Sequence, residues 1–478
     1  MSRDPVAPVF ARLDATGADP RVDGVARFRA WRPGPDGGGE RFEELADPFP
    51  QGPTEAATAR LQRRHGIAAS DLRGKPPPEE VARRFAGFVG EGPVVCLERT
   101  RFAPWFDRLL GAPAQNVAVV SLVELARLLL PGRTAADPQR FLAALSGGRR
   151  FGPGGPLPED LPGLLGALLL ETIRLPAPAF RLAASLLTGL PERYAERDPA
   201  AAGFLRAAFA LLDRPSGWRA PKGEARDPLP EGAFSAAARP LRSAIREAAD
   251  AEPRLVEAWE RLQEEPLPNE AREPVPFDDS EREAVDLAFA DVLPRMFMEE
   301  AGGEDAGLFH RKGQHDLARR VVEHLEGGDF LIVDAPTGTG KTLAYLIPAL
   351  LWARRAGVRV AVSTFTRALQ EQAFEREIPR AVEALARAGV EGDFRVALLK
   401  GRANYVCGRK LRALAPEGED DPDEWLAWGV LCLFHLCDAT GDLDRLPGLA
   451  PIPTAGDTAG LALRRTRDEV RAEIGCCT

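Results

Sequence analysis

The order of hydrophobic and polar positions divides the 478-residue chain into segments with different expected secondary structure. In the first part, short apolar runs such as 94–97 and 118–120 alternate with stretches of helical spacing such as 122–130. Short apolar runs predict strands, and apolar residues three and four positions apart predict helices. Residues 1–175 are therefore expected to form an α/β domain.

The middle of the chain has a different pattern. Residues 176–304 are rich in Ala, Leu, Arg and Glu at helical spacing, and polar segments with Pro and Gly interrupt them at 214–232 and 265–279. Such interruptions indicate loops between helices. We expect residues 176–304 to form a helical connector.

From residue 305 onward, strands and helices are predicted to alternate again. The predicted strands are 330–333, 358–363 and 396–399, and the predicted helices are 314–325, 343–356 and 367–376. Strands separated by helices predict a parallel sheet, in which ligands bind at the carboxyl ends of the strands. The chain as a whole is therefore expected to be of the α/β class.

The segment at the end of the first of these strands has the composition of a phosphate-binding loop. Residues 330–342 read FLIVDAPTGTGKT, an apolar run followed by small residues, a lysine and a threonine. Small residues let successive backbone amides converge on one anion at the N-terminus of the next helix. Lys341 would reach the β- and γ-phosphates of a nucleotide, and Thr342 would ligate Mg²⁺. The predicted nucleotide-binding residues are Ala335, Pro336, Thr337, Gly338, Thr339, Gly340, Lys341 and Thr342.

Two neighbouring elements carry further polar side chains. Arg311 and Gln314 precede the loop, and a glutamine amide can both donate to and accept from the edge of adenine. The alternative to a role in binding adenine is that residues 311–314 are an ordinary polar start of a helix. After the loop, residues 360–372 place Thr364, Thr366 and Gln370 at a turn, where hydroxyl and amide groups suit contacts with a nucleic-acid backbone.

Composition narrows the class of protein. The formal net charge of −9 gives no global basic field, so any contact with nucleic acid must come from a local groove. No apolar run reaches membrane-spanning length and the N-terminus lacks an apolar signal core, so a cytoplasmic protein without membrane contact is expected. The six cysteines do not follow a secreted disulfide pattern, and most lie near the C-terminus, where a metal site must be considered.

Four elements in this order resemble the DinG/XPD type of superfamily 2 DNA helicases. They are Arg311–Gln314, the loop 335–342, the turn 364–372 and the segment 399–407, which reads LKGRANYVC. The resemblance covers about residues 305–478. It implies a RecA-like ATP-binding domain over 305–400 and an iron–sulfur domain over 401–478. It also implies ATP, Mg²⁺ and a [4Fe-4S] cluster as cofactors, and unwinding of single-stranded or forked DNA in the 5′ to 3′ direction during repair or replication.

The resemblance also implies roles for individual residues. Lys341 and Thr342 would serve hydrolysis, Gln314 would recognise adenine, and Cys407 would be the first cluster ligand. Cys477 is the preferred second ligand, with Cys476 as the alternative, whereas Cys432 and Cys437 are expected to be buried or free thiols. The acidic run 420–424 follows no predicted strand and is expected in a loop. Because further cysteines, a DEAH-type box and a second motor domain are not found here, the chain is expected to be an N-terminal portion that is inactive alone.

A second resemblance concerns residues 1–175. The tripeptide His65–Ile67 and the segment 120–131 resemble elements of the DEDD proofreading exonucleases, which implies a ribonuclease H-like fold. Two-metal catalysis in such sites needs several carboxylates. Of the expected acids only Asp14 remains, because the corresponding positions at 98–103, Ser121 and 155–160 do not supply the others. We therefore expect a degenerate exonuclease domain retained for docking or for positioning DNA.

Two hypotheses for function follow. The first is an ATP-dependent DNA helicase of the DinG type, of which this chain is a part. The alternative is a noncatalytic DNA-binding or adaptor protein built from an inactive exonuclease fold and half of a motor. A phosphate-loop kinase fits less well, because the elements 364–372 and 400–407 have no role in it. Protein partners are not indicated by the sequence.

Overall fold

The chain folds into two compact units. In this computed structural model the described residues are 7–17, 19, 23–34, 38–49, 52, 54–111, 117–132, 145–146, 151, 155–213, 231–251, 275–301, 311–336, 338–417, 421–438, 440–446 and 450–472. Unit 1 comprises residues 1–264 and 402–478, and unit 2 comprises residues 265–401. The chain therefore leaves unit 1, builds unit 2 and returns.

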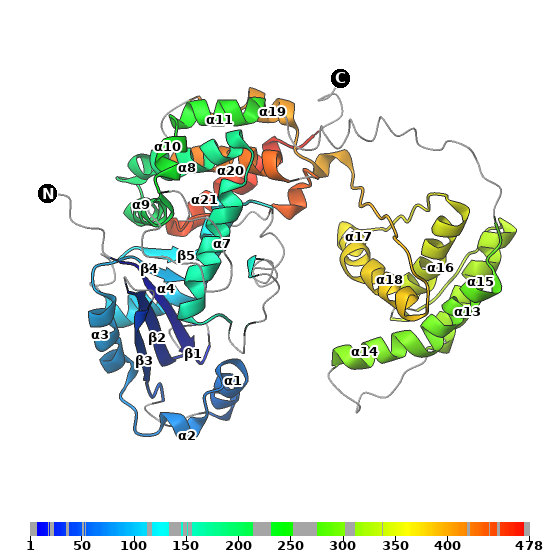
Figure 1. Cartoon of the computed structure of the whole chain (residues 1–478), viewed down its shortest axis with the longest axis horizontal. Coiled ribbons are helices and arrows are strands. Elements are labelled where there is room, and N and C mark those ends of the chain that lie inside the picture. The colour runs from blue at the N-terminus through cyan, green and yellow to red at the C-terminus, as the bar shows by residue number, and fades with distance from the viewer. Residues whose placement is uncertain are drawn as a thin grey trace. The chain divides into compact units, whose positions relative to one another are not determined.

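A five-stranded sheet lies in the N-terminal half of unit 1 (Figure 1). Its strands are β1 (Val9–Ala15), β2 (Val25–Pro33), β3 (Gly39–Leu45), β4 (Val94–Cys96) and β5 (Val119–Ser121), in the order β3-β2-β1-β4-β5. β2 is antiparallel to β1 and β3, whereas β1, β4 and β5 run parallel. The strands predicted at 94–97 and 118–120 are thus confirmed, and the sheet is mixed.

Helices cover the sheet on both faces because side chains alternate along each strand. The helices of this region are α1 (Glu55–His65), α2 (Ala69–Leu72), α3 (Pro78–Val89), α4 (Arg99–Leu110) and α5 (Leu122–Leu129). Phe28 packs with Phe85 of α3 and Phe106 of α4 in one core. Phe10 and Val120 belong to a second core with α5 and the helices that follow. The predicted helix at 122–130 is confirmed as α5.

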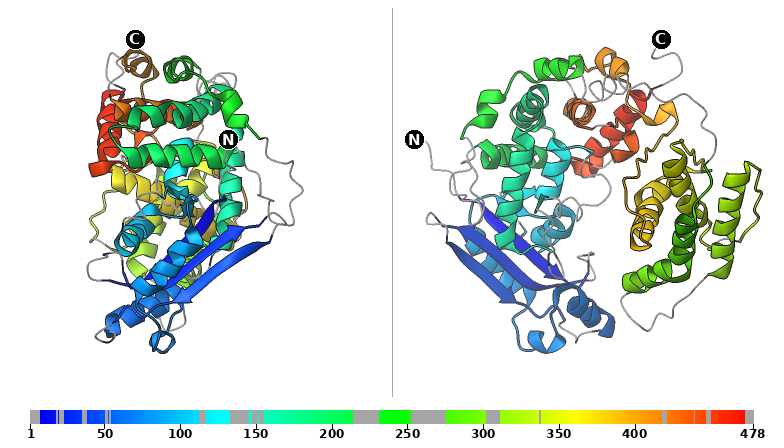
Figure 2. Two further views of the ribbon diagram at one scale, coloured as in Figure 1. Left: turned by 90° about the vertical axis from the view of Figure 1, so that its left-hand side faces the viewer. Right: turned by 45° about the vertical axis from the view of Figure 1, so that its right-hand side comes forward.

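The second half of unit 1 is helical (Figures 1 and 2). It contains α7 (Leu161–Ile173), α8 (Ala177–Tyr194), α9 (Pro199–Asp213), α10 (Ala233–Ala237), α11 (Leu241–Asp250), α19 (Gly408–Ala413), α20 (Pro422–Cys437) and α21 (Thr458–Glu469). α8 packs against α9, α11 and α20, and all of them share one hydrophobic core. The predicted connector 176–304 is therefore divided: α8 to α11 belong with residues 402–478, whereas residues from 265 belong to unit 2.

A buried polar contact joins α8 to α20. The Tyr194 hydroxyl donates to Asp423 Oδ1 at 2.6 Å, and Arg197 Nη2 donates to Asp423 Oδ2 at 3.0 Å. Burial and the hydrogen bond to Asp423 raise the pKa of Tyr194, so the phenol stays protonated and keeps donating. The loop predicted at 420–424 is wrong for residues 421–424, since Asp421 caps α20 and Asp423 lies in its first turn; Asp420 is outside the described residues.

Unit 2 is helical in its described residues (Figure 1). Its elements are α13 (Asp279–Leu287), the π-helical segment η3 (Ala288–Val292), α14 (Leu293–Ala301), α15 (Lys312–Gly327), α16 (Lys341–Ala356), α17 (Arg367–Gln372), the π-helical segment η4 (Ala373–Glu377) and α18 (Ile378–Arg387). The core contains Val285, Ala318, Ile347 and Leu385. The three predicted helices are confirmed as α15, α16 and the pair α17–η4.

The three strands predicted in unit 2 are wrong. Residues 330–333, 358–363 and 396–399 are extended, but within the described part of unit 2 no strand pairing joins them. Phe330 and Ile332 are 98% and 96% exposed. Extended backbone becomes a sheet only when a neighbouring strand exchanges hydrogen bonds with it, and an apolar pattern does not supply that neighbour. The parallel sheet expected over 305–400 is therefore not present in the described residues.

None of the helices in the described ranges has the length and apolar character needed to cross a membrane.

Candidate nucleotide-binding site

The predicted phosphate loop connects an extended segment to the N-terminus of α16. Gly338 and Gly340 adopt positive φ angles of 81° and 78°, and Gly340 is the N-cap of α16. Residues with a Cβ rarely adopt this conformation, which explains the two glycines. The loop therefore ends at the N-terminus of α16, where the positive end of the helix dipole favours an anion. Thr337 lies outside the described residues.

The start of α15 is bonded to this loop. Gln314 Nε2 donates to the Gly340 carbonyl at 2.8 Å, and Arg311 Nη1 donates to the Gly338 carbonyl at 3.0 Å. A Cβ placed on Gly340 would overlap the Gln314 amide, so the two residues fit only because one of them is glycine. The structure thus brings Arg311 and Gln314 to the loop, where they hold its backbone. The role of Gln314 in recognising adenine stays a prediction.

Lys341 is the cation of the site. Its Nζ donates to the carbonyls of Ala335 and Pro336 at 2.6 and 3.0 Å, and the Thr339 hydroxyl donates to the Pro336 carbonyl at 3.0 Å. The ammonium group therefore lies against the backbone of the loop at Ala335 and Pro336. Thr342 follows as the second residue of α16 and is partly buried. Glycine amides, a lysine and a cradle closed to larger side chains fit the phosphates of a nucleotide.

Two of the predicted nucleic-acid residues, Thr364 and Thr366, lie in the turn before α17, and the third, Gln370, lies in α17 itself. The Thr366 hydroxyl accepts from Leu369 N at 3.2 Å and caps α17, and the Thr364 hydroxyl donates to the Thr366 carbonyl at 3.1 Å. Gln370 Nε2 donates to the Leu399 carbonyl at 2.6 Å. These side chains shape the turn and tie it to the extended segment 396–399. Phe365, which was not among the predicted residues, lies between the two threonines and is 98% exposed.

The cysteines are distributed over unit 1. Cys407 is buried, caps α19, and its amide donates to the Val470 carbonyl at 2.7 Å. Cys477 and Cys476 lie outside the described residues. Cys432 is buried in α20, where burial raises the pKa of its thiol to about 12, and neither Cys432 nor Cys437 forms a disulfide. Within the described ranges, no three His, Cys, Asp or Glu side chains are grouped so that they could hold a metal. The cluster ligands stay predictions.

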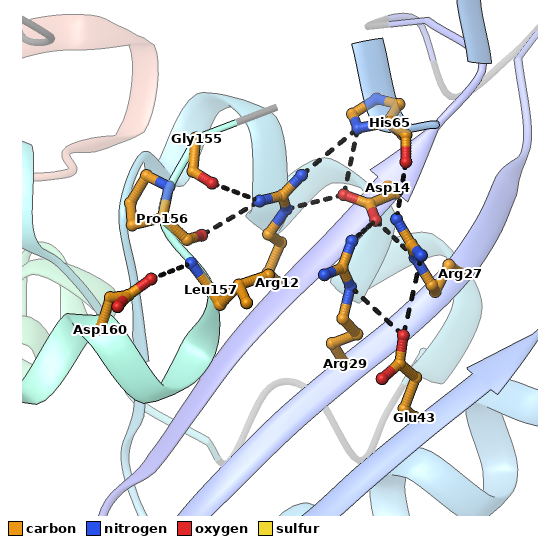
Figure 3. A network of polar contacts seen from close by, with 10 residues as sticks. All are labelled: Arg12, Asp14, Arg27, Arg29, Glu43, His65, Gly155, Pro156, Leu157 and Asp160. Carbon is orange, nitrogen blue, oxygen red and sulfur yellow. Dashed lines mark hydrogen bonds and ion pairs between the residues drawn. The ribbon is translucent and has the colours of Figure 1, made fainter. Parts of the chain in front are cut away.

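A second polar site lies on the sheet of unit 1 (Figure 3). We call it the Asp14 cluster; its members are Arg12, Asp14, Arg27, Arg29, Glu43 and His65. Asp14 is completely buried, and it accepts from Arg12 Nε at 2.7 Å, Arg27 Nε at 2.8 Å and Arg29 Nη2 at 2.5 Å. His65 Nδ1 lies 3.2 Å from Asp14 Oδ1.

The electrostatics of this cluster oppose binding of a metal. Burial alone would raise the pKa of Asp14, but the hydrogen bond with His65 and the charges of Arg12 and Arg29 hold that pKa well below its usual range. The carboxylate is therefore ionised, and guanidinium groups occupy both of its oxygens. The three arginines would repel a metal cation placed next to them. That Asp14 lacks the partners for two-metal catalysis stays a prediction.

The structure brings together several segments that the sequence analysis had considered separately. Arg12 Nη1 donates to the carbonyls of Gly155 and Pro156 at 2.7 and 3.1 Å, so the region 155–160 meets β1. Ser121 instead caps α5 and donates to the Leu97 carbonyl. Arg27 and Arg29 were not predicted as part of this site. Their signal is the alternation of charged and apolar residues in VARFRAWR, which places the arginines on one face of β2.

Comparisons with known proteins identify the segment that carries the loop. Residues 316–395 match the family described as DEAD/DEAH box helicase. The chain is 37% identical over 171 residues to the ATP-dependent helicase DinG of Mycobacterium tuberculosis strain H37Rv, which is 35% of this chain and 24% of that protein. It is 43% identical over 138 residues to the ATP-dependent DNA helicase YoaA of Escherichia coli K12, which is 29% of this chain and 20% of that protein.

A third relative carries a different name. The 3′-5′ exonuclease DinG of Bacillus subtilis strain 168 is 33% identical over 153 residues, which is 31% of this chain and 16% of that protein. The chain spans about a quarter, or less, of the length of the relatives it matches. The resemblance drawn from the loop and its neighbouring motifs is confirmed, and this chain is a relative of the DinG-type helicases of superfamily 2.

Proposed function

We propose that this chain is part of an ATP-dependent DNA helicase of the DinG type, which couples ATP hydrolysis to 5′ to 3′ unwinding of DNA. The observation that carries the proposal is the loop 335–342, held at two carbonyls by Arg311 and Gln314 and closed over by Lys341. Two side chains at the start of α15 thus fix the loop backbone beside the N-terminus of α16, where the phosphates of a nucleotide would bind. The names of the relatives support the same activity.

The residues of the loop divide the work of binding a nucleotide. The amides of Gly338 and Gly340 and the N-terminus of α16 would hold the phosphates, and Lys341 would exchange its two carbonyl acceptors for phosphate oxygens. Mg²⁺, when bound by Thr342 and the phosphates, would neutralise charge during phosphoryl transfer. Gln314 would keep its hydrogen bond to the Gly340 carbonyl, so a shift of the loop on binding nucleotide would also shift α15.

The DNA would contact the turn before α17. Thr364, Thr366 and Gln370 are proposed to face the sugar-phosphate backbone, and the exposed ring of Phe365 would stack on a base, since aromatic rings bind single strands without regard to sequence. The iron–sulfur cluster is proposed to use Cys407 and Cys477 together with further cysteines. The mixed sheet with helices on both faces supports a ribonuclease H-like, exonuclease-like domain over residues 1–175.

A second candidate is the noncatalytic DNA-binding or adaptor protein. The Asp14 cluster favours it for unit 1, because the one remaining acid of the expected exonuclease site is occupied by three arginines. The two candidates differ in whether the loop of unit 2 binds nucleotide.

The test is substitution of the loop lysine. Lys341→Ala removes the only cation that the loop itself supplies, so affinity for ATP should fall by at least about tenfold, the effect of roughly 1.4 kcal/mol. Binding of a fluorescent ATP analogue to the full 478-residue chain measures this without requiring turnover.

The matched control is Lys75→Ala, which removes the same charge from an exposed position in unit 1. Its affinity for the analogue should equal that of the parent chain. If Lys341→Ala binds the analogue as tightly as Lys75→Ala does, the proposed nucleotide site is wrong.

A further inference from the structure

The charged side chains of the Asp14 cluster form two rows across three strands. In the register of the sheet, Arg29 lies opposite Arg12 on one side and opposite Glu43 on the other, and Arg27 lies opposite Asp14. Because side chains alternate between the faces of a strand, all five project from one face. Three guanidinium groups thus share a small area with two carboxylates (Figure 3).

The two carboxylates differ in how well they neutralise the arginines. Asp14 is fully buried and accepts a hydrogen bond from each of the three guanidinium groups. The Glu43 side chain is 59% exposed and lies 3.7 Å from Arg27 Nη1 and 3.9 Å from Arg29 Nε. These distances exceed those of hydrogen bonds, so Glu43 contributes only a solvated and weakly coupled charge.

A count of donors shows which arginines remain available. Arg12 uses its remaining nitrogens on the carbonyls of Gly155 and Pro156 and against His65. Arg29 Nε is buried and has no hydrogen-bond partner among the described residues. Arg27 Nη2 donates to the His65 carbonyl at 2.9 Å, and in the described part of the chain Arg27 Nη1 has the 3.7 Å contact with Glu43 and no hydrogen bond. Both available donors therefore point to the side where Glu43 lies.

We propose that Arg27 and Arg29 bind a phosphate group of a single-stranded nucleic acid, and that this phosphate takes the place now held by the Glu43 carboxylate. Guanidinium groups donate to phosphate oxygens in paired, charge-assisted hydrogen bonds, and Asp14 holds both arginines in place for this contact. A phosphate would satisfy the Arg29 Nε–H and offset the excess of positive charge. The choice of a nucleic acid over free phosphate as the source rests on the proposed function.

The test uses the full chain and two probes, a fluorescent single-stranded oligodeoxynucleotide and inorganic phosphate. Glu43→Gln removes the competing charge from an exposed side chain, so it should tighten binding of the oligonucleotide several-fold. Arg29→Gln should weaken binding and reduce the slope of log affinity against log salt by about 1, the change expected for one lost phosphate contact.

The control is Arg84→Gln on α3, where Arg84 pairs with Glu44 and Glu80 outside the cluster. It changes the net charge as Arg29→Gln does, and it should leave the salt slope unchanged. Should Arg29→Gln fail to fold, as judged by circular dichroism, Glu43→Gln alone decides.

The outcomes separate the sources and the sites. Opposite shifts in oligonucleotide affinity for Glu43→Gln and Arg29→Gln support the proposal. Shifts in inorganic phosphate binding alone overturn the assignment to nucleic acid, and shifts no larger than those of Arg84→Gln overturn the site. Binding of an ATP analogue should be the same in all three variants, so failure here leaves the nucleotide site of unit 2 untouched, and Lys341→Ala tests that site separately.

Discussion

Single residues determine whether the phosphate loop keeps its shape. Gly338 and Gly340 have nearly the same backbone conformation, with φ angles of 81° and 78°, but their surroundings differ. A Cβ on Gly338 would meet nothing within 4 Å, whereas a Cβ on Gly340 would overlap the amide of Gln314. Conformational strain is thus common to both positions, and the contact with α15 belongs to Gly340 alone.

This difference predicts unequal effects of the same substitution. Gly338→Ala should cost about 1–2 kcal/mol of backbone strain, and Gly340→Ala should cost that amount plus the loss of the Gln314 hydrogen bond. Affinity for an ATP analogue should therefore fall further in Gly340→Ala, by roughly another tenfold. Equal losses in the two variants would show that Gln314 does not hold the loop.

Residue-scale prediction from the sequence succeeded where chemistry is local. The order of Lys341, Thr342 and the glycines follows from what a phosphate requires, and the loop lies where the sequence placed it. The hydrogen bonds of Arg311 and Gln314 to the loop could not be predicted, because the two motifs are separated along the chain and meet only through the packing of α15 on α16. The arginines around Asp14 were missed for the same reason, since cross-strand register brings them together.

At the scale of elements, the helices could be predicted from the sequence, but the strands could be predicted only in unit 1. α5, α15 and α16 follow from apolar residues at helical spacing, which each helix satisfies by itself. A strand depends on a partner: β4 and β5 have neighbours, while the extended segments at 330–333 and 358–363 do not within the described residues. The same apolar signal therefore gave a correct prediction in unit 1 and a wrong one in unit 2.

The contact between α8 and α20 offers a test at this scale. Tyr194→Phe removes the donor to buried Asp423 and leaves that carboxylate with Arg197, so unit 1 should lose about 1–3 kcal/mol of its free energy of unfolding. Urea unfolding followed by circular dichroism measures the loss. Tyr345→Phe, which removes a hydroxyl from α16 in unit 2, is the control and should change the free energy of unfolding by no more than about 0.5 kcal/mol. A loss as large in Tyr345→Phe would contradict the role given to the Tyr194–Asp423 contact.

At the scale of the whole molecule, the two compact units should unfold separately. Each has its own hydrophobic core, and the two cores have no residue in common. An ATP analogue at about 100 times its Kd should stabilise unit 2 alone, by about 2.7 kcal/mol. Tyr194→Phe should destabilise unit 1 alone. Differential scanning calorimetry would show two transitions, of which each treatment moves one; a single transition that both treatments move would contradict this division.

The interrupted path of unit 1 has a consequence for its synthesis. Gly429 of α20 lies so close to Leu186 of α8 that a Cβ there would overlap the leucine, yet all of unit 2 is translated between these helices. At about 5–20 residues per second, the ribosome needs on the order of ten seconds or more to deliver α20 after α8. During that interval the part of the apolar surface of α8 that α20 later covers has no partner helix. Translation speed and chaperone capture during this window, rather than the final stability of the core, would then set how much of the protein reaches its native fold.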